Sequence, residues 1–279
     1  MENIITRSYI EDYCVSLLAD ERAPGTVQKY RRDLTVFAHW LDGRAVTKEN
    51  AAGWKAHLMD RHYAPRTVNS MLAAVNGFCK YMGWNIKVKF LKIQRQLFRD
   101  PTRELNRMEY NSLLAAARSS GQERLALIME TLCATGIRIS ELRYITVEAV
   151  KTRRATIALK GKIRTILLSA KLCRKLLKYA KKQKIASGEV FLTKSGKSIS
   201  RRQVWYELKR LCKAAGVEAS KVFPHNFRHL FATIFYKACK DIARLADVLG
   251  HSSIETTRIY LTVSGEDQAR QLDRLGLVS

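Results

Sequence analysis

Hydrophobic residues recur every three or four positions through most of the chain, which is the spacing of one face of an α-helix. In the first hundred residues the clearest series is Val27, Tyr30, Leu34, Phe37 and Leu41. Signals for helix ends divide this region into four predicted helices. They run over 8–18, from a cap at Thr26 to about 41, from a cap at Thr47 onward, and from Pro65 to about 82. The pattern predicts a small all-α module in which each helix buries one face.

A second helical region follows a basic segment. Residues 84–100 carry five Lys or Arg side chains without a clear hydrophobic period, and Pro101 follows them. We interpret this segment as an extended linker along a charged surface, with a domain boundary near 90–103. Further helices are predicted at 106–117, 123–134, 200–215, 224–238 and 241–249. The predicted domains are therefore 1–90 and 104–279, joined by a linker at 91–103.

Two short runs interrupt the helical pattern of the second domain. ATIAL at 155–159 and TILLS at 165–169 are rich in β-branched residues, and Gly161 lies among the five residues between them. This spacing predicts a β-hairpin whose loop contains Lys160 and Lys162. The expected fold class is mainly α with a small β-sheet, in two domains.

Composition bounds the class of protein. The chain has 279 residues, of which 47% are hydrophobic, enough for packed cores. No segment approaches the roughly 18 apolar residues of a membrane span, and the N-terminus lacks a secretory pattern. We therefore expect a cytoplasmic protein without a membrane partner. Its six scattered cysteines form no C-x-x-C pair, and we expect them to be reduced, in neither a disulfide framework nor a zinc site.

The charge of the chain indicates a polyanionic partner. It has 50 Lys plus Arg against 25 Asp plus Glu, a net charge of +25 at pH 7. Residues 151–188 contain 13 basic side chains and no acidic one. A solvated helix face usually mixes both signs, and a membrane-surface helix presents an apolar face with Trp or Phe. A run of one sign in a foldable segment favours contact with phosphates.

Two polar motifs stand out at predicted helix ends, although each alone is a common surface arrangement. In ATGIRISEL (134–142), Gly136 ends a helix, Ser140 can cap the next one, and Arg138 lies between them. In PHNFRHLFAT (224–233), His225 and Arg228 are three residues apart and share a helical face.

The stretch LGHSSIETTRIYL (249–261) places a histidine nine residues before a tyrosine. Nine residues are two and a half helical turns, so His251 and Tyr260 would point apart on a single helix. Gly250 can end one helix, however, and Ser252 with Glu255 matches a capping box that begins another. His251 is therefore predicted in a turn and Tyr260 on the helix that follows.

Taken in order, these residues resemble the tyrosine recombinase, or phage integrase, family, in particular its compact Xer-like members. The order is Arg, hairpin Lys, His-x-x-Arg, Gly-His and Tyr. The matching residues are Arg138, Lys160, His225, Arg228, His251 and Tyr260. The likeness covers nearly the whole chain, with 1–90 resembling the SAM-like core-binding domain and 104–279 the α+β catalytic domain. The short hairpin turn leaves Lys162 as an alternative to Lys160, and HNFRH stands where His-Asp-Leu-Arg-His is frequent.

The resemblance implies a site-specific DNA recombinase that acts through a covalent 3′-phosphotyrosyl intermediate at Tyr260, in integration or excision, inversion or dimer resolution. Arg138 and Arg228 would hold the phosphate, the two histidines would assist proton movement, and the hairpin lysine would protonate the departing 5′ oxygen. Glu141 is expected to orient Arg138 and His229 to be structural. Neither a metal nor another cofactor is expected.

The resemblance also implies partners. These are double-stranded DNA with specific recombination sites and a homo-tetramer on two duplexes, or an assembly with a paralogous recombinase. Candidates for the DNA surface, each equally interpretable as solvated, are Arg31, Arg32, Arg66, Arg201 and Arg202. The C-terminal segment, in which Ala269, Leu272 and Leu275 share a face, would dock on a neighbouring subunit or fold back. A type IB-like topoisomerase and a non-catalytic basic DNA-binding protein are the alternative functions.

Overall fold

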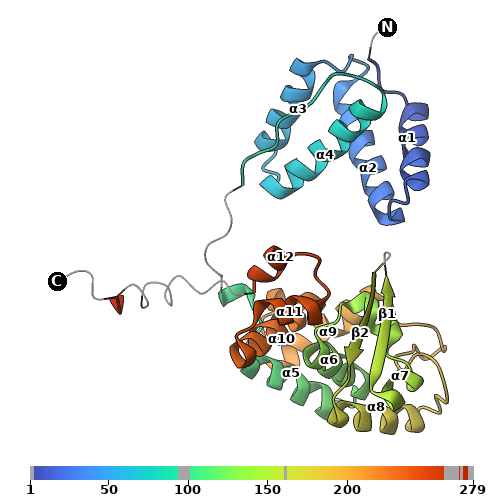
Figure 1. Cartoon of the computed structure of the whole chain (residues 1–279), viewed down its shortest axis with the longest axis vertical. Coiled ribbons are helices and arrows are strands. Elements are labelled where there is room, and N and C mark those ends of the chain that lie inside the picture. The colour runs from blue at the N-terminus through green and yellow to red at the C-terminus, as the bar shows by residue number, and fades with distance from the viewer. Residues whose placement is uncertain (1–2, 94–100, 160–161, 261–269, 271–272, 276–279) are drawn as a thin grey trace. The chain divides into compact units, whose positions relative to one another are not determined.

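The chain divides into two compact units, 1–95 and 96–279 (Figure 1). The computed structural model describes residues 3–93, 101–159, 162–260, 270 and 273–275. Each unit has its own hydrophobic core, and the division between them falls within the predicted linker at 91–103. The predicted fold class is confirmed, since helices predominate and β1 and β2 form a two-stranded sheet. Within the described ranges, no helix is long and apolar enough to span a membrane.

The first unit packs four predicted helices around an aromatic core. They are α1 (Arg7–Ala19), α2 (Pro24–Leu41), α3 (Lys48–Asp60) and α4 (Pro65–Tyr81). Thr47 accepts a hydrogen bond from the N–H of Asn50 and begins α3 as predicted. Helix α2 begins at Pro24, not after a cap at Thr26, because proline fits the first helical turn, where its missing N–H costs nothing.

The segment after α4 packs against the first unit, which corrects part of the predicted linker. The side-chain amide of Asn76 accepts from the N–H of Val88 at 2.9 Å and donates to its carbonyl at 3.0 Å. Asn69 pairs with Leu91 in the same way. Two asparagines of α4 thus satisfy the main chain of this segment, and Val88 is buried in the core. The linker residues 94–100 lie outside the described residues.

The second unit is built around α6 (Glu123–Thr135), most of whose side chains are buried. Helices α5 (Arg107–Ser119), α8 (Ala170–Lys182), α9 (Arg201–Ala215) and α10 (Pro224–Cys239) all contact α6 (Figure 1). The other elements are η1 (Pro101–Arg103), η2 (Ile139–Tyr144), α7 (Val147–Thr152), β1 (Arg154–Leu159), β2 (Lys162–Leu167), η3 (Ala219–Lys221), α11 (Ile242–Leu249) and α12 (Ile254–Arg258). The five helices predicted in this region agree with α5, α6, α9, α10 and α11 to within two residues.

Helix α8 lies inside the basic run 151–188 and has no counterpart in the sequence prediction. Leu172, Leu176 and Tyr179 face the core, whereas Lys171, Arg174, Lys178, Lys181 and Lys182 are exposed. The apolar positions keep a helical period beneath the charge. Much of this basic run is therefore the outer face of a packed helix.

The hairpin is tighter than predicted. Its antiparallel register runs from Arg154 paired with Leu167 to Leu159 paired with Lys162, so β2 begins three residues before the predicted start at 165 and the predicted five-residue loop is wrong. Side chains alternate between the two faces along a strand. Ile166 faces the core, whereas Ile163 is 77% exposed. Arg164 lies two residues before Ile166 and therefore shares its inward face. Lys160 and Gly161 lie outside the described residues.

Candidate active site

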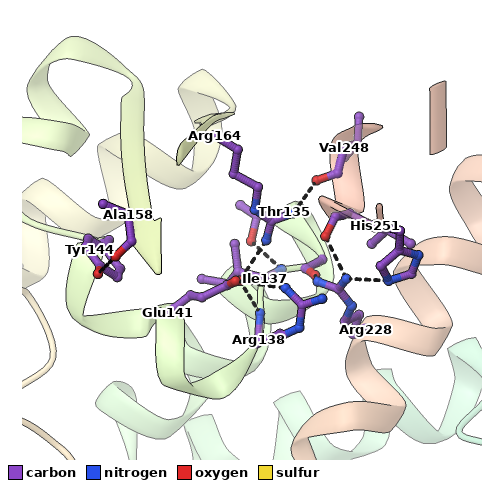
Figure 2. Close-up of polar contacts among 12 residues, drawn as sticks. Thr135, Ile137, Arg138, Glu141, Tyr144, Ala158, Arg164, Arg228, Val248 and His251 are labelled. Carbon is purple, nitrogen blue, oxygen red and sulfur yellow. Dashed lines mark hydrogen bonds and ion pairs between the residues drawn. The ribbon is translucent and has the colours of Figure 1, made fainter. Parts of the chain in front are cut away.

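Turns of the second unit bring Arg138, Arg228 and His251, three of the predicted catalytic residues, close together (Figure 2). Arg138 lies between α6 and η2, and Arg228 lies on the first turns of α10. His251 occupies the turn between α11 and α12, and Tyr260 follows α12. The site therefore depends on packing between segments that are up to about 120 residues apart in sequence.

Arg228 joins two of these turns from inside the protein. It is 1% exposed, and its Nη1 donates to the carbonyl of Gly136 at 2.5 Å while its Nη2 donates to that of Leu249 at 2.7 Å. Burial lowers its pKa, as does the charge of Arg138, and a side-chain hydrogen bond with Tyr260 opposes this shift. A guanidinium remains charged at neutral pH, so a fixed positive charge lies at the centre of the site.

Gly136 makes this close approach of the two turns possible. It ends α6 with φ +64°, and a Cβ atom here would lie 2.3 Å from the Phe231 ring and 3.0 Å from Leu249. A side chain at 136 would therefore be both strained and obstructed. The prediction that Gly136 ends a helix is confirmed.

Arg138 is the more accessible of the two arginines. Its side chain is 43% exposed, and its Nη1 donates to Oε1 of Glu141 at 3.1 Å. The buried Glu141 carboxylate also accepts from the main-chain N–H of Arg138 at 2.7 Å. The predicted cap at Ser140 is wrong, because η2 begins directly after Arg138 and Glu141 supplies the acceptor at its start. Glu141 has the contacts that an orienting residue would need.

His251 is held in one tautomer. Its Nε2 lies 2.9 Å from Nη2 of Arg228, and its Nδ1 lies 2.8 Å from Oγ1 of Thr257. A guanidinium can only donate, so Nε2 accepts and the proton belongs on Nδ1, from which it donates to Thr257. Burial, followed by the charges of Arg228 and Arg138, lowers the pKa of His251 to about 4. The imidazole is therefore neutral at pH 7.

Tyr260 packs beside His251. The two ring centroids are 5.9 Å apart with the planes inclined by 12°, and Tyr260 is 2% exposed among residues of α10 and α11. Helix α12 ends at Arg258, so Tyr260 lies after this helix and not on it as predicted. The predicted cap at Ser252 is also wrong, since the Ser253 hydroxyl accepts from the N–H of Glu255. Helix α12 is only five residues long, so the chain can turn back after it. The Tyr260 ring can therefore pack against His251, although the two residues are only nine positions apart.

Two further histidines extend along α10. His225 is exposed one turn before Arg228, yet enough protein surrounds it that desolvation lowers its pKa, and the charges of Arg228 and Arg138 lower it further. The ring of His229 packs edge-on against His225 at 4.8 Å and against Tyr260 at 4.5 Å. His229, predicted to be structural, thus contacts two candidate catalytic rings.

The lysine position stays a prediction, and an unpredicted arginine lies close to it in sequence. Lys160 is outside the described residues, and the main chain of Lys162 begins β2. Arg164, two residues further on, donates to Glu141 at 2.7 Å and to the carbonyl of Val248 at 2.9 Å (Figure 2). Counting back from Ile166 in steps of two would have placed Arg164 on the inward face.

The candidate DNA-contacting arginines differ in their surroundings. All five are exposed, but Arg31 also pairs with Glu11 at 2.7 Å and Arg32 lies 3.5 Å from Asp33. The charge of Arg201 also lowers the pKa of His225, which places the N-terminus of α9 beside the site.

Metal ligands do not gather at the described positions of this site. Across the part of the chain that the structure describes, no three His, Cys, Asp or Glu side chains are grouped so that they could hold an ion. The positive charges at the described positions of the site belong to Arg138, Arg164 and Arg228.

Comparison with known protein families assigns both units of the chain. Residues 103–266 match the model described as "Phage integrase family", and residues 10–85 match "Phage integrase, N-terminal SAM-like domain". The chain belongs to the phage integrase family. Both halves of the resemblance seen in the sequence are thereby confirmed.

Individual relatives of this integrase-family chain cover most of its length. It is 31% identical to "Tyrosine recombinase XerC" of Roseiflexus castenholzii over 89% of this chain and 87% of the relative. It is 27% identical to "Tyrosine recombinase XerA" of Pyrococcus furiosus over 99% and 97%. A solved structure titled as the XerH site-specific recombinase bound to palindromic difH substrate, a post-cleavage complex, has a TM-score of 0.73 at 18% identity, covering 98% of this chain and 84% of that one. This last likeness shows a shared fold.

Proposed function

We propose that this integrase-family protein is a site-specific recombinase that breaks and rejoins DNA through a covalent bond between Tyr260 and a 3′ phosphate. The observation that carries the proposal is the convergence of Tyr260, His251 and Arg228, linked by hydrogen bonding and ring packing, with Arg138 on the accessible side. A phenol beside two guanidiniums combines a nucleophile with charges suited to a phosphate.

The proposed reaction conserves the phosphodiester bond. The phenolic oxygen of Tyr260 attacks phosphorus, the bond to the 5′ oxygen breaks, and that oxygen leaves as a hydroxyl after protonation. Arg138 and Arg228 stabilise the negative charge that develops on the non-bridging oxygens. The hydroxyl of a second strand then attacks the phosphotyrosyl ester and releases Tyr260. No water or nucleotide cofactor enters this sequence.

Proton transfer falls to the histidines and the hairpin lysine. His225 is exposed, and its lowered pKa keeps it neutral at pH 7, so that it can accept the phenolic proton. Lys160, or Lys162 in its place, would protonate the 5′ oxygen. Because Tyr260 is 2% exposed, its attack also requires the turn after α12 to move toward the DNA.

The partners follow from the chemistry. One chain supplies one Tyr260, and exchange between two duplex sites breaks four strands, so we propose a tetramer of this chain, or of this chain and a paralogous recombinase, on two specific DNA sites. We also propose that this protein acts in the cytoplasm, as expected from its sequence.

A nicked suicide duplex tests the nucleophile. Duplexes selected from a random library by binding to the wild type are rebuilt with a nick a few nucleotides 3′ of each candidate phosphate, so that the short fragment carrying the freed 5′ hydroxyl diffuses away. We expect a protein–DNA adduct on denaturing gels for the wild type, equally in chelator, and none for Tyr260→Phe at equal DNA binding. An adduct that persists in Tyr260→Phe, or that requires a divalent metal, would contradict the proposed mechanism.

A two-site plasmid separates recombination from simple relaxation. The wild type should convert two matched sites into recombinant products. Relaxation without any exchange would favour a topoisomerase, and binding without adducts would favour a non-catalytic DNA-binding protein.

A further inference from the structure

We propose that Arg164 is a positioning residue that fixes the Arg138 turn and the His251 turn with a single guanidinium. The proposal rests on the catalytic roles proposed above for Arg138 and His251, and it adds a residue that those roles do not include. Arg164 projects inward from β2, and its side chain is 14% exposed (Figure 2). Its partners are protein groups on two different turns, which distinguishes it from an arginine that serves mainly as a DNA contact.

The first connection runs through Glu141. Nη2 of Arg164 donates at 2.7 Å to Oε2 of Glu141, the same oxygen that accepts from the main-chain N–H of Arg138 at 2.7 Å. The other oxygen of this carboxylate accepts from the Arg138 guanidinium. Arg164 therefore fixes the carboxylate that fixes both the main chain and the side chain of Arg138.

The second connection runs to the end of α11. Nη1 of Arg164 donates at 2.9 Å to the carbonyl of Val248, three residues before His251. A Cβ atom on Gly250 would lie 2.5 Å from this Nη1 and 2.6 Å from Cδ of Arg164. The turn that presents His251 is thus shaped against the Arg164 side chain, which explains a glycine at 250 beyond its φ of +65°.

Charge balance gives Arg164 a second effect on Arg138. The buried Glu141 carboxylate faces two guanidiniums, so its negative charge is shared between them. Without Arg164, the carboxylate would be compensated by Arg138 alone, which would draw the Arg138 side chain inward and reduce the positive potential it offers to a phosphate. With Arg164 in place, Arg138 retains more of its charge for the DNA.

Arg164→Met tests this role, because methionine keeps an unbranched side chain but removes the charge and the donors. Arg154→Met is the matched control, an exposed arginine on β1 of the same hairpin. The nicked duplex described above provides single-turnover rates of adduct formation at saturating protein. We expect Arg164→Met to bind DNA within about threefold of the wild type and to form adduct at least about tenfold more slowly, while Arg154→Met keeps the wild-type rate.

Two further experiments distinguish a positioning role of Arg164 from a general structural defect in the variant. In Arg164→Met/Glu141→Gln, the uncompensated carboxylate is gone, so the combined loss should be smaller than the product of the two single losses. A neutral methylphosphonate at the scissile position requires less positive charge, so the rate ratio between wild type and Arg164→Met should shrink. A merely structural defect would leave this ratio unchanged.

The outcomes distinguish this proposal from the proposed function. Absence of an adduct with the wild type would refute the catalytic roles themselves. A normal wild-type adduct, with Arg164→Met equal to the control or with an unchanged ratio on methylphosphonate, would overturn the role of Arg164 alone. If Arg164→Met does not fold, the rates of Arg164→Met/Glu141→Gln and of Arg164→Lys test the proposal instead. Arg164→Lys retains the charge but cannot reach both partners with one planar group, so it should cleave more slowly than the wild type, and an unchanged rate would overturn the proposal.

Discussion

Arg228 donates a hydrogen bond from Nη2 to Nε2 of His251 across 2.9 Å, so the imidazole accepts from a cation. Protonation of His251 would place two positive charges at this distance and remove the acceptor. The neutral tautomer and the buried guanidinium therefore stabilise each other, and this pairing has a measurable pH dependence.

We predict that one histidine titrates near pH 4 and that the protein loses stability in mild acid. His251 has a pKa of about 4 in the folded protein against an ordinary value of 6.5. Between these values the unfolded chain binds more protons, so the free energy of unfolding falls as pH drops from about 6.5 toward 4 and is unaffected by this group above about 7. NMR titration of the histidine ring protons and denaturant unfolding at several pH values measure both effects. An assigned His251 resonance that titrates near pH 6.5 would contradict the prediction.

We predict that substitution of Arg228 lowers both the stability of the protein and its rate of DNA cleavage, whereas substitution of Arg138 lowers mainly the rate of cleavage. In Arg228→Met the carbonyls of Gly136 and Leu249 lose their buried donor, so the free energy of unfolding should fall by about 3 kcal/mol. In Arg138→Ala an exposed side chain is removed while Arg164 still pairs with Glu141, so the loss should stay below about 1 kcal/mol. Cleavage should fall on the order of a hundredfold or more in both variants. Denaturant unfolding and suicide-duplex assays measure the two quantities, and equal destabilisation would contradict the assigned burial.

We predict that Gly136→Ala destabilises the second unit more than Gly216→Ala does. Both glycines follow helices with φ +64°, so alanine carries a similar backbone strain of about 1 kcal/mol at each. At 136 the new Cβ would also collide with Phe231, whereas at 216 no atom lies within 4 Å. The difference in unfolding free energy should be at least about 1 kcal/mol. Equal losses would show that the loop at 136 relaxes freely.

We predict that Arg202 contributes to DNA affinity and Arg31 does not. Arg202 is exposed at the start of α9, beside the site, whereas Arg31 is paired with Glu11 on the first unit. Arg202→Ala should weaken binding across DNA sequences and reduce the slope of log affinity against log salt by about 1. Fluorescence anisotropy over a salt series measures this slope, with Arg31→Ala as the comparison. The opposite ranking would place the DNA contact on the paired arginine.

Sequence patterns predicted the elements that local chemistry controls. The helices α5, α6, α9, α10 and α11 begin and end where caps, prolines and glycines indicate. Predictions failed where a local signal had a competitor. Helix α2 begins at Pro24 and not after Thr26, and α12 is capped by Ser253 and not by Ser252. Helix α8 was not predicted, because its many Lys and Arg residues made its helically spaced apolar residues harder to recognise.

By itself, the sequence determined the fold class and the family and pointed to the candidate catalytic residues, because these inferences depend on periodicity and on ordered motifs along one chain. Only the tertiary structure decided that Arg228 is buried between two carbonyls, that His251 is neutral, and that Arg164 joins two turns. The physical reason is that hydrogen-bond partners, desolvation and the sharing of one buried carboxylate arise between segments distant in sequence. No local pattern encodes those distances.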